Sequence, residues 1–155
     1  MEYLAVKWLH VLSSTFLFGT GVGSAFYMLF TSLTRDVGAT AVVTRYVVIA
    51  DYLFTTPTII LQPLSGFYLV HLAGFPVTSA WILWSVVLYL LAVACWLPVV
   101  WMQIRMRDLA GQAAQQAAGR LPARYWLFMR WWAALGGVAF VAFVVIFYLM
   151  VTKPV

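Results

Sequence analysis

Charged side chains are scarce in this chain. Only 8% of its 155 residues are charged, with nine Lys or Arg and four Asp or Glu, whereas 65% are hydrophobic. A soluble domain carries about 25% charged residues, which cover its surface. The composition therefore excludes an ordinary soluble domain and predicts that a lipid bilayer surrounds most of the chain.

Several residue patterns that carry chemistry are also missing. Cys95 is the single cysteine, so no intrachain disulfide can form and we expect a buried thiol. The sequence has no phosphate-cradling Gly-rich loop, no H-E-x-x-H pair and no nucleophile elbow. It has no visible inverted repeat of the transporter kind, and no basic patch interleaved with exposed aromatic residues. Hydrolytic chemistry has no candidate residues, and nucleic acid is not an expected partner.

What the chain does contain is four apolar runs, each longer than the roughly 20 residues that cross a bilayer. They cover residues 3–33, 42–72, 79–106 and 125–151. The third run continues as a polar cytoplasmic extension that breaks near Gly119 and Pro122, and Thr40 can cap the second helix. The first run is too long for a signal peptide and should stay as a helix. We predict an all-α fold, a transmembrane four-helix bundle that forms one integral membrane domain over residues 1–155.

The basic residues predict how this bundle is oriented. Arg35 and Arg45 flank the first loop, while the second loop, AGFPVT, has no charge. Five more arginines surround the third loop: Arg105, Arg107, Arg120, Arg124 and Arg130. Because Lys and Arg concentrate in cytoplasmic loops, we expect loops one and three inside, and loop two and both termini on the periplasmic side.

The chain has only two histidines, His10 and His71, and both lie within these apolar runs. A polar ring in hydrocarbon is costly and normally has a partner. At the helical rise, His10 lies about 9 Å below the outer end of the first helix, and His71 about 2–6 Å from the outer end of the second. Two imidazoles at similar depth on neighbouring helices are the ligands that a six-coordinate b-type haem uses. We therefore expect His10 and His71 to bind the iron of haem b.

Small and apolar residues share helix faces with these histidines. Ser14, Leu17 and Gly21 follow His10 at helical spacing and leave room for a flat macrocycle, and Phe67 precedes His71 by one turn. The candidate cofactor-binding residues are thus His10, His71, Ser14, Leu17, Gly21 and Phe67. The sequence identifies no catalytic residue.

Structural roles for the same histidines remain open. His71 can sit in the membrane interface, and His10 can donate to a backbone carbonyl or to a serine one turn away. A copper or other metal pair is a further alternative, although two histidines are too few for a closed zinc site. Met150, near the outer end of the last helix, can replace one histidine as an axial ligand, or it can simply fill a gap.

Two other polar residues lie within the second run. Asp51 is either a proton-relay carboxylate or, the interpretation that we favour, the ion-pair partner of Arg45, Arg105 or Arg130. Gln62 lies between Pro57 and Pro63, which free backbone carbonyls. We expect Gln62 to satisfy those carbonyls, and facing a quinone or a haem edge is its alternative role.

Two segments carry a resemblance to known families. The opening LAVKWLHVLSSTFLFGTGVGSAF resembles the first helix of small bacterial inner-membrane proteins of the copper-resistance CopD type and the HemJ type of protoporphyrinogen oxidase. TPTIILQPLSGFYL is similar to a related bacterial family of predicted integral membrane proteins of unsettled function. The resemblance implies a bacterial inner-membrane protein in which His10 ligates haem b. The chain lacks the Pro-Arg and second His of the HemJ first helix and any Met- or His-rich outer loop, so the substrate stays open.

The functional prediction is a b-type haem-binding membrane protein that serves electron transfer or a small oxidoreductase reaction. A single haem near one face needs a second redox centre, which a quinone, a periplasmic redox protein or a homo-oligomeric neighbour can supply. Two alternatives come from other classes. One is a cofactor-free accessory subunit of a larger membrane complex, and the other is a copper or other metal-ion binding protein or permease.

Overall fold

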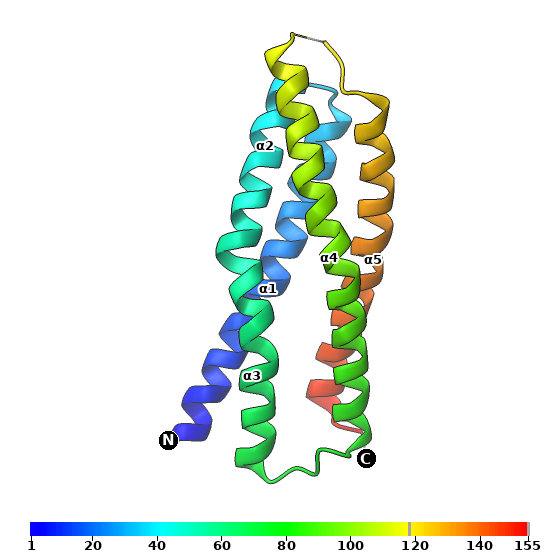
Figure 1. Cartoon of the computed structure of the whole chain (residues 1–155). Coiled ribbons are helices and arrows are strands. Elements are labelled where there is room, and N and C mark those ends of the chain that lie inside the picture. Colours follow the sequence, from blue (N-terminus) through cyan, green and yellow to red (C-terminus); the bar gives the residue numbers. More distant parts are fainter. Residues whose placement is uncertain (118, 155) are drawn as a thin grey trace.

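The computed structural model describes residues 1–117 and 119–154, and these residues form helices joined by short connections (Figure 1). The helices are α1 (Glu2–Leu33), α2 (Val37–Ala50), the π-helix η1 (Asp51–Thr55), α3 (Thr56–Ala73), α4 (Ala80–Gln115) and α5 (Ala123–Thr152). Because α2, η1 and α3 run on as one segment, the described residues contain four segments that are long and apolar enough to cross a membrane. The predicted all-α transmembrane four-helix architecture is confirmed.

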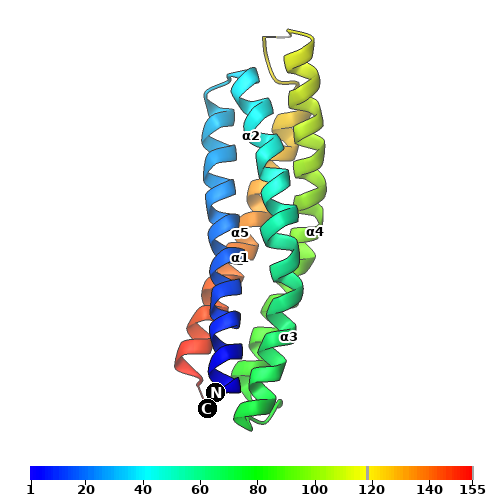
Figure 2. The same ribbon diagram turned by 90° about the vertical axis from the view of Figure 1, so that its left-hand side faces the viewer.

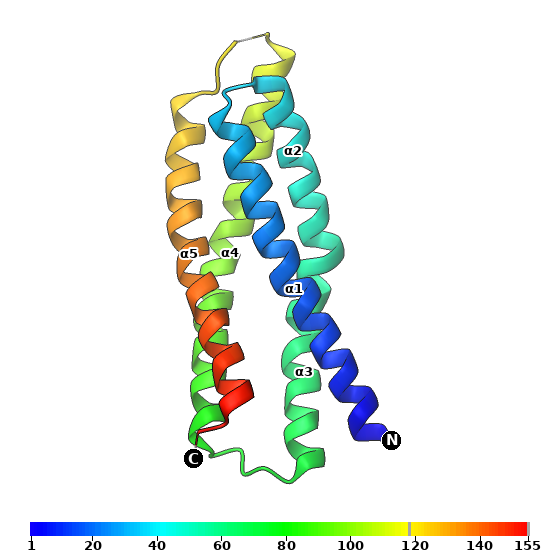
Figure 3. The same cartoon turned by 180° about the vertical axis from the view of Figure 1, so that it is seen from behind.

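The two ends of the bundle are distinct. Both termini and the α3–α4 connection lie at one end, and the α1–α2 and α4–α5 connections lie at the other (Figures 1, 2 and 3). Within the bundle α4 packs mainly on α5, and α1 packs mainly on α2 and α3. We call the two ends the terminal end and the basic end, because the arginine-flanked loops are gathered at the latter.

The second span begins earlier than the hydropathy predicts. Asp36 is the N-cap of α2, and its Oδ1 accepts a hydrogen bond from the Ala39 N–H at 2.9 Å. Thr40, the expected cap, instead lies inside the helix, where its hydroxyl donates to the Asp36 carbonyl at 2.6 Å. An aspartate is as good a cap as a threonine, and its position sets the start of the helix at Val37.

Two prolines shape the middle of this span. The Thr56 N–H donates to the carbonyl of Asp51, five residues back, and Pro57 has no N–H to continue the pattern. The π-turn thus falls where the proline interrupts the α-helix. Pro63 likewise leaves the Ile59 carbonyl without its helical donor, and the Tyr89 hydroxyl from α4 donates to that carbonyl. The prediction that Gln62 fills this role is wrong, because Tyr89 fills it.

The main apolar core lies toward the basic end. It includes Met28, Met106 and Tyr125, and the Tyr125 hydroxyl is hydrogen-bonded to the Ser32 hydroxyl at 2.6 Å. Toward the terminal end a smaller cluster joins Val70, Trp81 and Ile82, with Met150 packed against it. This contact agrees with the packing interpretation of Met150.

Candidate functional site around His10

Polar side chains cross between α1 and α3 in the terminal half of the bundle. His10 pairs with Ser65, Ser13 pairs with Gln62, and the Tyr68 hydroxyl donates to the carboxylate of Glu2. Positions rise along α1 as they fall along α3, which is the register of two antiparallel helices. The polar residues therefore form one seam, and His10 lies within it.

The hydrogen bonds of Ser65 assign the tautomer of His10. The Ser65 hydroxyl donates to the Leu61 carbonyl at 2.6 Å, one turn back on its own helix. A hydroxyl has a single proton, so at the 2.8 Å contact with Nδ1 of His10 it must accept. Nδ1 carries the ring proton, and the lone pair of the neutral imidazole is on Nε2. Among the described residues no group is hydrogen-bonded to that nitrogen.

Gln62 fixes the backbone beneath the ring. Its amide nitrogen donates to the His10 carbonyl at 2.9 Å and to the Ser13 hydroxyl at 2.5 Å. Both Gln62 and Ser13 are buried. A buried amide with two partners holds α1 and α3 in one register, since a shift of either helix would leave polar groups unpaired.

Gly66 lets the imidazole approach the α3 backbone. A Cβ placed on Gly66 would lie 3.3 Å from Cε1 of His10 and 3.9 Å from Nδ1. The first distance is tighter than an ordinary van der Waals contact, so a larger residue would push the ring away from Ser65. Gly66 is thus part of the site, although it has no side chain.

His71 lies outside this seam. It follows Ser65 by six residues, which is about 9 Å along the helix and about 120° around it. The His71 side chain is exposed, whereas Ser65 and Gln62 are buried. The His10 imidazole packs against the face of α3 that carries Ser65, whereas His71 projects from another face of α3 and lies nearer to the end of that helix. The two imidazoles are therefore not at the same depth. Ligation of one iron by both residues stays a prediction.

The remaining predicted site residues have mixed positions. Leu17 is buried on α1 at 5% exposure, whereas Phe67 is 50% exposed. Ser14 donates to the Val11 carbonyl of its own helix at 2.7 Å, and a Cβ on Gly21 would meet nothing within 4 Å. None of these residues is hydrogen-bonded to the His10 imidazole in the part of the chain that the structure describes.

A second polar group is buried where the second span meets α4. The predicted ion pair between Asp51 and an arginine is wrong, since the one ion pair in residues 1–117 and 119–154 joins Arg107 and Asp108 at 2.8 Å. Asp51 instead accepts a hydrogen bond from Thr55 at 2.9 Å through Oδ1, and Gln103 lies beside it. Oδ2 of Asp51 and Oε1 of Gln103 are both buried without a partner.

Comparison with known families identifies the chain at the level of a family. Residues 4–154 match the family described as "Predicted integral membrane protein (DUF2269)". The chain belongs to this family. The description agrees with the four spanning segments and names no activity. Comparisons with curated proteins and with solved structures found no match.

For this DUF2269 chain the sequence did contain a signal for the residues that His10 contacts. In LQPLSG, Gln62, Ser65 and Gly66 are spaced three and four residues apart, so they lie on one face of a helix. His10 and Ser13 have the same spacing on the first helix. Two matched polar stripes in apolar spans predict a helix–helix interface. The histidines alone do not predict this interface, because Gln62, Ser65 and Gly66 are not iron ligands.

Proposed function

We propose that this integral membrane protein holds a b-type haem through Nε2 of His10 and takes part in electron transfer or a small oxidoreductase reaction. The observation that carries the proposal is the hydrogen bond from Nδ1 of His10 to Ser65. Histidines that ligate a metal typically donate their other ring N–H to an oxygen acceptor such as a carboxylate, a backbone carbonyl or water, which fixes the tautomer and the ring orientation. The Ser65 hydroxyl oxygen is an acceptor in the same position.

The number of available ligands favours haem over a bare metal ion. No group of three or more His, Cys, Asp or Glu that could hold a metal ion exists among the described residues. A copper site or permease built from protein donors alone would need such a group. A porphyrin brings four nitrogen ligands of its own, so one or two imidazoles suffice.

Each residue of the seam has a part in holding the group. Ser65 orients the imidazole, Gln62 and Ser13 fix its backbone, and Gly66 leaves the ring room against α3. When bound, haem supplies one-electron redox chemistry. His10 would hold the iron, and His71 would be a second ligand only if its exposed side chain reaches the same iron.

The setting of the proposal follows from charge and resemblance. The positive-inside rule places the basic end in the cytoplasm and His10 in the periplasmic half of a bacterial inner membrane. The similarity of the first helix to CopD-type and HemJ-type proteins supports haem at this depth. A quinone, a redox protein or a second copy of the chain would then exchange electrons near the outer face.

The absorption spectrum of the detergent-purified protein tests the proposal. We expect a Soret band, after haem supplementation if necessary, that His10→Ala removes. His71→Ala should change the band only if His71 is the second ligand, so this variant decides between six- and five-coordinate iron. Lack of a Soret band even with added haem would contradict the proposal. A colourless protein that co-purifies with a stoichiometric partner would indicate the accessory-subunit alternative, and metal without porphyrin would indicate the metal-ion alternative.

A further inference from the structure

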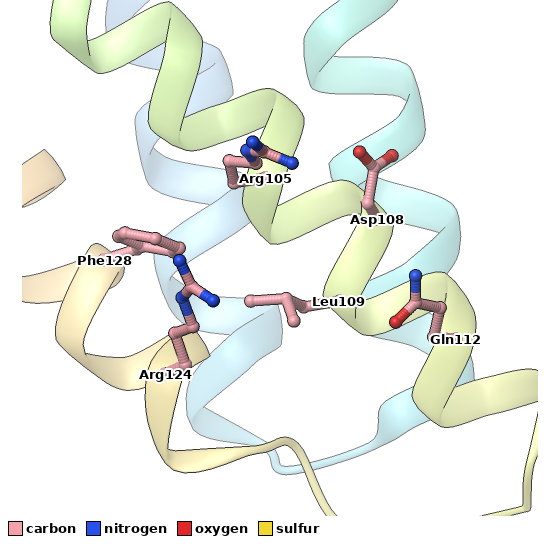
Figure 4. A pocket seen from close by; sticks show the side chains of 6 residues that line it. All are labelled: Arg105, Asp108, Leu109, Gln112, Arg124 and Phe128. Carbon is pink, nitrogen blue, oxygen red and sulfur yellow. The ribbon is translucent and has the colours of Figure 1, made fainter.

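A polar pocket of about 240 Å³ lies at the basic end, away from the His10 seam. Its lining residues are Arg105, Asp108, Leu109, Gln112, Arg124 and Phe128 (Figure 4). Arg105, Asp108 and Gln112 recur every three or four residues, so they share one face of α4. Arg124 comes from the first turn of α5, so the pocket lies between two helices.

The two arginines of this pocket are not neutralised by carboxylates. The Arg105 guanidinium lies over the ring of Trp101, 5.6 Å from its centroid, and that of Arg124 lies over the ring of Phe128 at 5.4 Å. Asp108, the one acidic side chain in the lining, is paired with Arg107 at 2.8 Å. No other ion pair exists among residues 1–117 and 119–154. The pocket therefore has the charge of an anion site.

The depth of the pocket places it beside lipid headgroups. Trp101 is 49% exposed, and exposed tryptophans near the ends of membrane spans lie at the interface. Arg105 is one turn farther toward the basic end, which is about 6 Å. The polar layer of a bilayer is about 5–8 Å thick on each side. Phosphate groups of the surrounding lipid are thus present at this level at high concentration.

We propose that Arg105 and Arg124 together bind the phosphate of an anionic phospholipid headgroup. A guanidinium presents paired N–H donors that match phosphate oxygens, and basic pockets between membrane helices on the cytoplasmic side are typical headgroup sites. Stacking on Trp101 and Phe128 holds both guanidiniums in place before the lipid arrives. The Gln112 amide lines the same pocket and can donate to a headgroup oxygen. This site goes beyond the haem proposal and does not depend on it.

Native mass spectrometry of the full-length protein tests this site. The detergent-solubilised protein is equilibrated with equal amounts of phosphatidylglycerol and phosphatidylcholine, and the retained lipid is counted. We expect the wild type to retain phosphatidylglycerol preferentially. Each arginine replaced by glutamine should weaken that preference about fivefold. Arg105→Lys with Arg124→Lys keeps the positive charge but loses the paired N–H donors of the guanidinium. Its preference for phosphatidylglycerol should lie between those of the wild type and the double glutamine variant.

The matched control is Arg120→Gln with Arg130→Gln, which removes the same charge from the same end of the bundle but does not touch the pocket lining. Retention in this control should equal that of the wild type. Equal losses in the control and in Arg105→Gln with Arg124→Gln would overturn the proposal, because nonspecific attraction would then explain them. Equal retention of the two lipids would also overturn it.

Free inorganic phosphate has the same chemistry as the lipid headgroup, and a thermal-shift measurement with inorganic phosphate tests for its binding. Stabilisation by millimolar phosphate without any lipid preference would mean that the site binds free phosphate instead.

Discussion

At the scale of single residues, the assignment of a proton decides what His10 can do. Ser65 donates to Leu61 and so must accept from Nδ1 of His10, which leaves Nε2 as the basic nitrogen. A water-exposed imidazole exchanges freely between tautomers, whereas this one is held in the tautomer that can bind a metal through Nε2. The hydroxyl at position 65 is thus a positioning group for the proposed site.

Replacing Ser65 by alanine tests that role. Ser65→Ala removes the acceptor of the Nδ1 proton, and we expect the affinity for haem to fall about 10- to 100-fold. Titration of haem into the purified apoprotein, followed at the Soret band, measures the change. Ser24→Ala is the matched control, because Ser24 lies on the same helix as His10, its hydroxyl bonds only to the Gly21 carbonyl, and it is not among the candidate haem-binding residues. Equal affinities of the two variants would contradict the role assigned to Ser65.

A second residue-scale prediction concerns the buried pair at Asp51. Oδ2 of Asp51 and Oε1 of Gln103 are both acceptors without donors. Asp51→Asn would keep the oxygen that accepts from Thr55 and add an N–H where two acceptors lack one. We expect the free energy of unfolding in detergent to rise by about 1 kcal/mol, measured by thermal melting. Asp108→Asn, which loses only the partly exposed ion pair with Arg107, should change it by about 0.5 kcal/mol or less. Destabilisation by Asp51→Asn would contradict this prediction.

At the scale of elements, the tie between α3 and α4 depends on a proline. Pro63 leaves the Ile59 carbonyl free, and the Tyr89 hydroxyl donates to it across the helix interface. A carbonyl buried in a membrane needs a donor from somewhere, so proline and tyrosine compensate one another. Pro63 is the neighbour of Gln62 on α3, so this contact supports the helix that carries the seam.

A double-mutant cycle measures that compensation. We expect Tyr89→Phe to lower the free energy of unfolding by about 1 kcal/mol, a typical value for a hydrogen bond between membrane helices. In a Pro63→Ala background the backbone N–H gained at position 63 supplies the missing donor, so the same change should cost far less. Tyr148→Phe, at an exposed site on α5, serves as the control. Additive effects of the two substitutions would contradict the coupling.

The sequence predicts the membrane spans well, because the bilayer requires a long apolar segment at each of them. A span needs only a long apolar run, so hydropathy finds all four segments from composition. Faces are harder to predict, because a helix in lipid is apolar all round and its rotation is set by its neighbours. His71 shows the consequence. Its distance from the helix end indicates that it lies near the outer surface, but whether it faces the same neighbour as Ser65 depends on a packing register that only the structure supplies.

At the scale of the whole molecule, the structure fixes which parts share an end and the charges predict which side that end faces. Thr78 in the α3–α4 connection and Lys153 after α5 lie at the terminal end, and Gln116 lies at the basic end. Single cysteines at these positions, in a Cys95→Ala background, report the orientation. With a membrane-impermeant maleimide on intact spheroplasts, we expect labelling at positions 78 and 153 and protection at 116 until lysis, because arginines keep the basic end inside. The reverse pattern would invert the topology and move His10 to the cytoplasmic half. Labelling that differs between positions 78 and 153 would contradict the bundle itself, because α4 and α5 cross the membrane in opposite directions and must return the chain to the side from which it started.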